Sequence, residues 1–171
     1  MDYITKPASR KQLRQYANFF REMFNAPKDE PFPVLELLDK LPDYFEGSYY
    51  KVVDNEDLPK NVVAQCVKND GKGFTIEIKQ YVYDGAMKRI GAYLGFILHE
   101  IVHIYMYEIG YTPVLQRSFE ETPIYCSVEW QVKALTGEIA MPYEETAGMS
   151  VSEIMKIYNV SKGFAKKRQR Y

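Results

Sequence analysis

The sequence predicts an α+β domain that is mainly helical, with a small antiparallel three-stranded sheet and a C-terminal helical pair. Apolar residues recur at helical spacing before residue 42 and again between residues 86 and 140. Between residues 48 and 79 they alternate instead, as in strands with one buried face. Beyond Pro142, two short segments with helix-capping residues follow each other closely. At 171 residues, the chain is long enough for one domain with a substantial core.

Two core-packing helices are expected in the N-terminal quarter. The first covers residues 9–25, with Ser9 as its cap and charged side chains such as Arg21 on faces other than its apolar stripe. A link containing prolines leads to a second helix over residues 34–41, which Pro42 should end. The first helix presents one stripe of large apolar side chains: Leu13, Tyr16, Phe20, Met23 and Phe24.

Three strands are expected next, over residues 48–53, 61–67 and 74–79. The last alternates most clearly, because its apolar residues are separated by threonine, glutamate and lysine. A short strand or turn at residues 81–83 should then lead to a central helix. That helix should run from about Ala86 to Tyr107 and end near Gly110.

The following helix should begin at Thr122, a capping residue, with Pro123 in its first position. It should continue to Ile139 or Ala140, before Pro142 ends it. The sequence therefore predicts a core domain over residues 1–142. Residues 143–171 should form a short helical extension packed on the same domain.

The C-terminal extension has the local features of two short helices joined by a tight turn, an arrangement similar to a helix-turn-helix. Residues 150–153 fit a capping box, and Asn159 can end the first helix. The second helix ends in a run of cationic residues, which could contact phosphate. A solvated basic helix end is the favoured interpretation, and a net charge of −1 also disfavours direct nucleic-acid binding.

The central helix carries the pattern His-Glu-x-x-His at His99, Glu100 and His103. These are the only two histidines of the chain, and they lie in an otherwise apolar segment. Histidines four residues apart share one helix face, so both imidazoles can bind one ion, and Zn²⁺ is the usual one. Glu100 can then take a proton from water as general base. The alternative interpretation is a pair of hydrogen-bonded core histidines.

A third ligand must come from outside the motif, and several glutamates follow it. Glu108 points about 140° away around the same helix. Glu129 is favoured because it lies within the apolar part of the next helix, where a buried carboxylate needs a partner such as a metal ion. The other candidates that the sequence leaves open are Glu120, Glu121, Glu138, Glu144 and Glu145.

The order of these motifs resembles the ImmA/IrrE family of small zinc metallopeptidases, which are gluzincin-like. The matching segments are residues 99–103, then residues 129–135 beginning Glu-Trp-Gln, then residues 139–142 ending Met-Pro. The resemblance implies a zincin-like metallopeptidase core over residues 1–142, in which His99, His103 and Glu129 bind Zn²⁺. It also implies that Glu100 is catalytic. Val102 replaces the family's glycine, which could narrow the cleft, and Val132-Lys133 replaces its Ala-Asn pair.

The leading functional hypothesis is therefore a zinc-dependent endopeptidase. The resemblance implies a specific protein substrate, a helix-turn-helix transcriptional repressor or an antitoxin of a phage, other mobile element or stress system. The alternative is a regulatory or toxin-type protein that binds such a partner without cutting it. A cleavage assay with and without a chelator distinguishes the two.

Composition and patterning suggest a cytoplasmic location. No run of 18 apolar residues is present, so no transmembrane helix is expected, and a net charge of −1 does not favour binding to an anionic membrane. The first residues lack the basic-then-apolar pattern of a signal peptide. Cys66 and Cys126 have no metal-type spacing and are expected to be reduced and inert.

Overall fold

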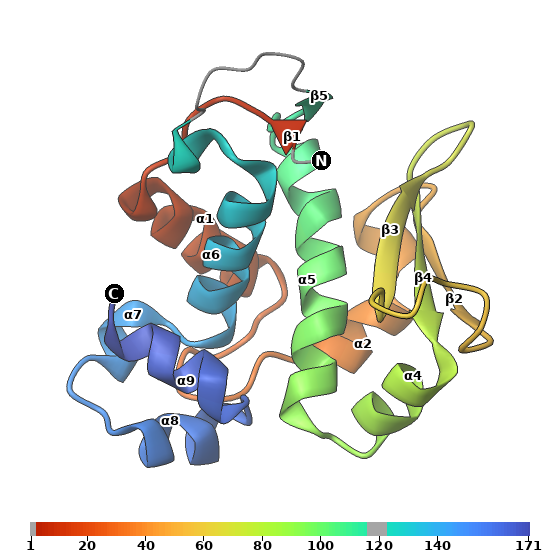
Figure 1. The fold of residues 1–171 in the computed structure, drawn as a ribbon. Coiled ribbons are helices and arrows are strands. Elements are labelled where there is room, and N and C mark those ends of the chain that lie inside the picture. The colour runs from red at the N-terminus through yellow and green to blue at the C-terminus, as the bar shows by residue number, and fades with distance from the viewer. Residues whose placement is uncertain (1–2, 116–122) are drawn as a thin grey trace.

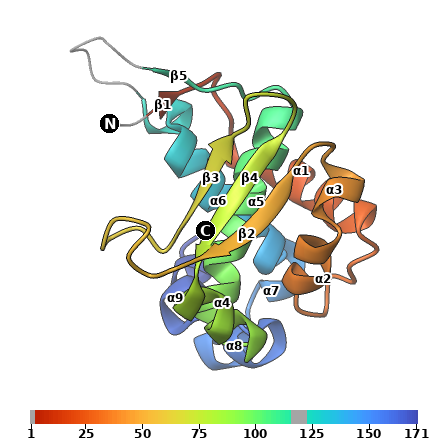
Figure 2. The same ribbon diagram turned by 90° about the vertical axis from the view of Figure 1, so that its right-hand side faces the viewer.

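The computed structural model describes residues 3–115 and 123–171. Helix α5 (Gly91–Glu108) runs through the middle of the molecule. A three-stranded sheet lies on one side of it, and helices α1 and α6 lie on the other (Figures 1 and 2). The chain is thus α+β and mainly helical, with a helical pair at its C-terminal end, which confirms the predicted fold class. No single helix in the described part of the chain is long and apolar enough to span a membrane.

The N-terminal helices form largely as predicted. Helix α1 covers Arg10–Met23, and Ser9 caps it in a capping box with Gln12. The predicted second helix is divided into α2 (Val34–Asp39) and α3 (Leu41–Tyr44). Pro42 lies in the first turn of α3 and does not end a helix. Proline is tolerated there because the first N–H groups of a helix have no partner within it.

Arg21 was predicted on a face of α1 away from the apolar stripe, and the structure shows that it is nevertheless fully buried. Its Nε donates a hydrogen bond to the carbonyl of Ile139 at 2.7 Å, and its guanidinium also reaches the carbonyls of Pro27 and Glu30. Burial lowers the pKa of Arg21 to about 10. Helical periodicity missed this position because carbonyl oxygens at the end of another helix cannot be seen in the local sequence.

The sheet contains β2 (Tyr49–Val53), β3 (Ala64–Lys68) and β4 (Phe74–Lys79), in the order β2-β4-β3. Strand β3 pairs antiparallel with β4, but β2 pairs parallel with β4, so the prediction of a wholly antiparallel sheet is wrong. Alternation in the sequence predicts which face of a strand is buried and does not predict its neighbour. The buried face carries the fully buried Ile76 and Ile78, and β3 and β4 lie against α5.

The segment at residues 81–83 is helical, not a strand or turn. It belongs to α4 (Gln80–Met87), which meets α5 at 115°. The chain turns between them at Arg89, which has a φ of +61° and whose carbonyl accepts a hydrogen bond from the Asn159 side chain at 2.8 Å. The central helix therefore begins at Gly91 and not at Ala86. A non-glycine residue with positive φ is uncommon, which is why this break was not predicted.

Helix α6 (Val128–Ala140) begins later than predicted. Ser127 caps it by accepting a hydrogen bond from the backbone N–H of Trp130 at 3.1 Å, and the short 3₁₀ helix η1 (Ile124–Cys126) precedes it. The predicted cap, Thr122, lies outside the described residues. The buried Gln131 donates to the carbonyls of Lys6 and Tyr125, which fixes the first turn of α6 beside the N-terminal segment.

The N-terminal segment also pairs with the chain that follows α5. Strand β1 (Tyr3–Ile4) lies antiparallel to β5 (Val114–Leu115), and Ile4 forms an isolated bridge with Ser127. This small two-stranded sheet lies at the same end of the molecule as the start of α6 (Figure 1).

The C-terminal extension comprises α7 (Tyr143–Thr146), α8 (Val151–Tyr158) and α9 (Lys162–Gln169). The predicted capping box at Ser150 and Glu153 is present, and Asn159 ends α8 in the left-handed conformation. Ile154, Tyr158 and Ala165 belong to the same hydrophobic core cluster as the residues of α1, α5 and α6.

A buried charge cluster joins α9 to α1 and α6. The carboxylate of Glu138 in α6 forms two hydrogen bonds with Arg168 in α9, at 2.7 and 3.0 Å. Arg10 and Arg14 of α1 reach the same carboxylate at 3.2 and 3.3 Å. The Glu138 side chain is 1% exposed, so its charge depends on these three arginines for compensation.

We expect Glu138→Gln to destabilise the protein strongly, because three arginines would then face a neutral amide in a buried site. Removing one partner of a buried ion pair typically costs about 3–5 kcal/mol of unfolding free energy. Urea denaturation measures this loss. The exposed Glu144 provides the control, since Glu144→Gln should change stability by less than about 0.5 kcal/mol. Equal effects of the two substitutions would show that the cluster is not structurally important.

Candidate metal centre

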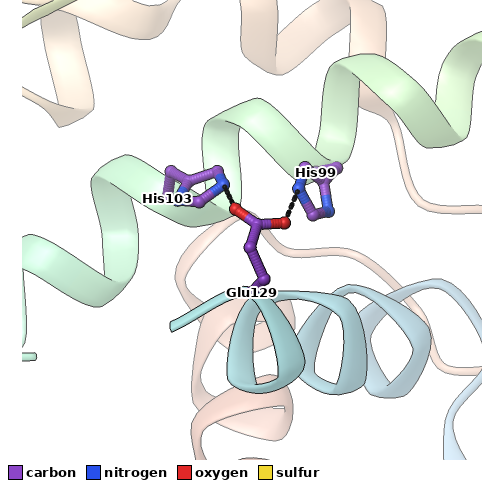
Figure 3. A group of neighbouring side chains, drawn as sticks. All are labelled: His99, His103 and Glu129. Atoms are coloured by element: carbon purple, nitrogen blue, oxygen red, sulfur yellow. Dashed lines mark ion pairs between the residues drawn. The ribbon is translucent and has the colours of Figure 1, made fainter. Parts of the chain in front are cut away.

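Three side chains that are far apart in the sequence meet between α5 and α6. His99 and His103 lie one turn apart on α5, and both point towards Glu129 at the start of α6 (Figure 3). Nε2 of His103 lies 3.1 Å from Oε1 of Glu129, and Nε2 of His99 lies 3.5 Å from Oε2. The two imidazole rings are nearly perpendicular, at 82°, with centroids 4.9 Å apart.

This group could hold a metal ion. One nitrogen from each histidine and one carboxylate oxygen all lie within 4.8 Å of one another. Ligand atoms about 2.0–2.1 Å from a tetrahedral zinc ion are separated by roughly 3.4 Å, close to the distances found here. Two imidazoles and one carboxylate also form a donor set that leaves a fourth position open, as in catalytic metal sites.

Glu129 occupies an unexpected position in its helix. It was predicted to be buried among the apolar residues of a longer helix, but α6 begins at Val128, so Glu129 lies in its first turn with its side chain 48% exposed. Hydrogen bonds with His103 and His99 hold the pKa of Glu129 well below its usual range. The structure thus brings Glu129 to the histidines, although the burial argument that favoured it was wrong.

The other candidate ligands lie elsewhere, or cannot be placed. Glu108 is the last residue of α5 and is exposed, and Glu138 is enclosed by arginines. Glu144 and Glu145 lie in the exposed first turn of α7. The remaining two, Glu120 and Glu121, lie outside the described residues. Among the described residues, only His99, His103 and Glu129 form such a group.

Glu100 lies beside strand β3, where the backbone N–H of Cys66 donates a hydrogen bond to its carboxylate. It is mostly buried, and burial raises its pKa, an effect that the charges of His99 and His103 oppose. The backbone N–H of Cys66 in β3 also favours its charged form. The Cys66 thiol has its pKa raised to about 12, chiefly by burial and also by Glu100.

The residues that depart from the ImmA/IrrE pattern, Val102 and Val132-Lys133, differ in whether they are buried. Val102 is fully buried in the core cluster, as is Val132, so neither side chain lies in the open site. Lys133 is exposed and lines a cavity next to His99. The structure therefore contradicts the expectation that Val102 narrows the cleft.

Comparison with known proteins adds no assignment. No protein-family model matches this chain, and no curated protein matches it. The candidate site therefore rests on the residues and their geometry.

We expect the purified protein to bind one divalent metal ion per chain when zinc is supplied. Because each residue provides a ligand atom, His103→Ala and Glu129→Ala should each weaken binding by more than about 100-fold, beyond the 10–100-fold typical of outer partners. Elemental analysis and competition with a chromogenic chelator measure this. Glu108→Ala is the matched control on α5 and should bind like the wild type. Undiminished binding by Glu129→Ala would remove Glu129 from the ligand set.

Proposed function

We propose that this protein is a zinc-dependent endopeptidase of the ImmA/IrrE type. The observation that carries the proposal is the meeting of His99, His103 and Glu129, with the largely buried Glu100 adjacent to them on α5. Two imidazoles and a carboxylate with a neighbouring glutamate are the residues that metallopeptidases of this class require. The order of the sequence motifs supports the same class by resemblance.

In this proposal, the three ligands hold the ion and Glu100 moves the proton. A bound zinc ion supplies a Lewis acid that polarises the scissile carbonyl and makes water nucleophilic. Glu100 accepts the proton of the attacking water and returns it to the leaving amine. Burial raises the pKa of Glu100, so its carboxyl group holds a proton more firmly than an exposed glutamate does.

The edge of the sheet offers a place for an extended substrate. Among the described residues, strand β3 pairs only with β4. Hydrogen bonds at Val63 and Asn69 show that the odd-numbered residues of β3 face β4. The backbone groups of Ala64, Cys66 and Lys68 therefore point to the open edge, where the N–H of Cys66 already donates to Glu100. Because β3 lies against α5, a peptide that adds to this edge would pass beside the site.

The proposed substrate is a specific protein partner. By the family resemblance, this is a helix-turn-helix repressor or an antitoxin. The half-exposed position of Glu129 is consistent with a macromolecular substrate, because the metal centre is open on that side.

We expect Glu100→Gln to retain zinc and to lose peptide cleavage by at least about 100-fold, the usual contribution of a positioned acid–base group. Zinc-loaded wild type and variant are incubated with unfolded casein and with a mixed peptide library, and products are identified by mass spectrometry. Undiminished cleavage by Glu100→Gln would contradict the mechanism. Peptide binding without any cleavage by the wild type would favour the non-cleaving binding protein instead.

A further inference from the structure

A cavity of about 450 Å³ opens beside the metal centre, and His99 forms part of its wall. Its other walls come from the first half of α5, from α6 and from α9, which lie together in Figure 1. This volume lies within the range of pockets that bind small molecules or large side chains. His103 and Glu129 do not line the cavity, so it adjoins the candidate metal centre only on the side of His99.

Two glycines keep this cavity open. Gly95 lies one turn before His99 on α5, and a Cβ atom there would meet nothing within 4 Å. Gly137 of α6 faces the same space, where a Cβ would only touch the ring of Phe164 at 3.9 Å. Glycine inside a helix is less stable than alanine, so both positions sacrifice helix stability for open volume.

The lining of the cavity is apolar. Phe96, Trp130, Ala134 and Phe164 contribute to it, and Phe96 is 40% exposed although it lies in the apolar central helix. Such a surface favours a large apolar side chain over water.

The rim of the cavity is cationic. Arg10 and Arg168 line it but are both paired with Glu138. Lys133, Lys167 and Arg170 also line it and are exposed, and within the described residues none of them forms an ion pair. No aspartate or glutamate in residues 3–115 or 123–171 is among those that line the cavity. An occupant that carries negative charge would therefore complement the rim.

We propose that this cavity binds the substrate chain next to the scissile bond, with a large apolar residue inside and acidic residues on the cationic rim. Lys133, Lys167 and Arg170 then determine specificity by selecting an acidic segment, and Gly95 provides the space for the apolar anchor. This inference rests on the proposed function, because His99 in the wall places the occupant beside the reacting peptide.

The first test measures binding without cleavage, using zinc-loaded Glu100→Gln protein and two labelled synthetic peptides. Both contain a central phenylalanine, flanked by glutamates in one peptide and by lysines in the other, and both carry an uncharged dye. We expect the acidic peptide to bind at least about tenfold more tightly by fluorescence anisotropy at low salt. Equal affinities would overturn the proposal.

Charge reversal tests whether the cations of the rim cause the preference for the acidic peptide. The triple variant Lys133→Glu, Lys167→Glu and Arg170→Glu should lose the preference for the acidic peptide. The control combines Lys11→Glu, Lys162→Glu and Lys166→Glu, which change the net charge equally at exposed sites, two of them on α9, outside the cavity. Loss of the preference in both variants would indicate a general charge effect and would contradict the proposal.

Substitutions that fill the cavity test whether it holds the apolar side chain of the peptide. Gly95→Leu should abolish binding of the acidic peptide while zinc content stays unchanged, and Gly95→Ala should retain binding and raise the Tm. Unchanged peptide binding by Gly95→Leu would overturn the role of the cavity.

Failure of this inference is distinguishable from failure of the proposed function. If the wild type cleaves library peptides at sites without apolar or acidic preference, the proposed endopeptidase activity is supported and the proposed role of the cavity is wrong. If the acidic peptide binds as expected but the wild type cleaves nothing, the cavity is supported as a peptide-binding site and the proposed endopeptidase activity is wrong.

Discussion

The position of α6 against α5 determines whether this chain can bind a metal ion. Both histidines lie on α5, whereas the carboxylate that completes the group lies in the first turn of α6. Buried polar contacts fix α6 at both ends. Gln131 binds the N-terminal segment at one end, and Arg21 binds the carbonyl of Ile139 at the other. Hydrogen bonds of this kind have directional geometry, so they set the rotation of the helix more closely than apolar packing does.

Several residues near the candidate metal centre lower the stability of the local structure. Glu129 is half exposed at its helix start, and Gly95 weakens the central helix. At the mouth of the cavity, Lys133, Lys167 and Arg170 form no ion pair with any described residue. Departures from stable local structure are expected at functional sites, where the missing contact is supplied by a ligand. Under the two proposals above, these ligands would be a metal ion, an apolar side chain and an acidic segment.

Local patterns predicted most elements, and their errors share one cause. The cap at Ser9 and the capping box at Ser150 were predicted because all the interacting groups lie within four residues. The parallel pairing of β2, by contrast, depends on β4 entering the sheet between two strands that are consecutive in sequence. The late start of α6 and the buried Arg21 likewise depend on contacts with distant segments. Local sequence carries no information on such contacts.

The sequence by itself determined the two histidines and the glutamate of the motif, because a spacing of four places side chains on one helix face wherever the helix lies. It also identified Glu129 as a candidate, though for a burial that the structure does not show. Tertiary structure alone decided that Glu129 meets the histidines while Glu138 meets three arginines. It also decided that a cavity adjoins His99. The physical reason is that both outcomes depend on how separate helices are oriented, which is set by contacts between residues far apart in the chain.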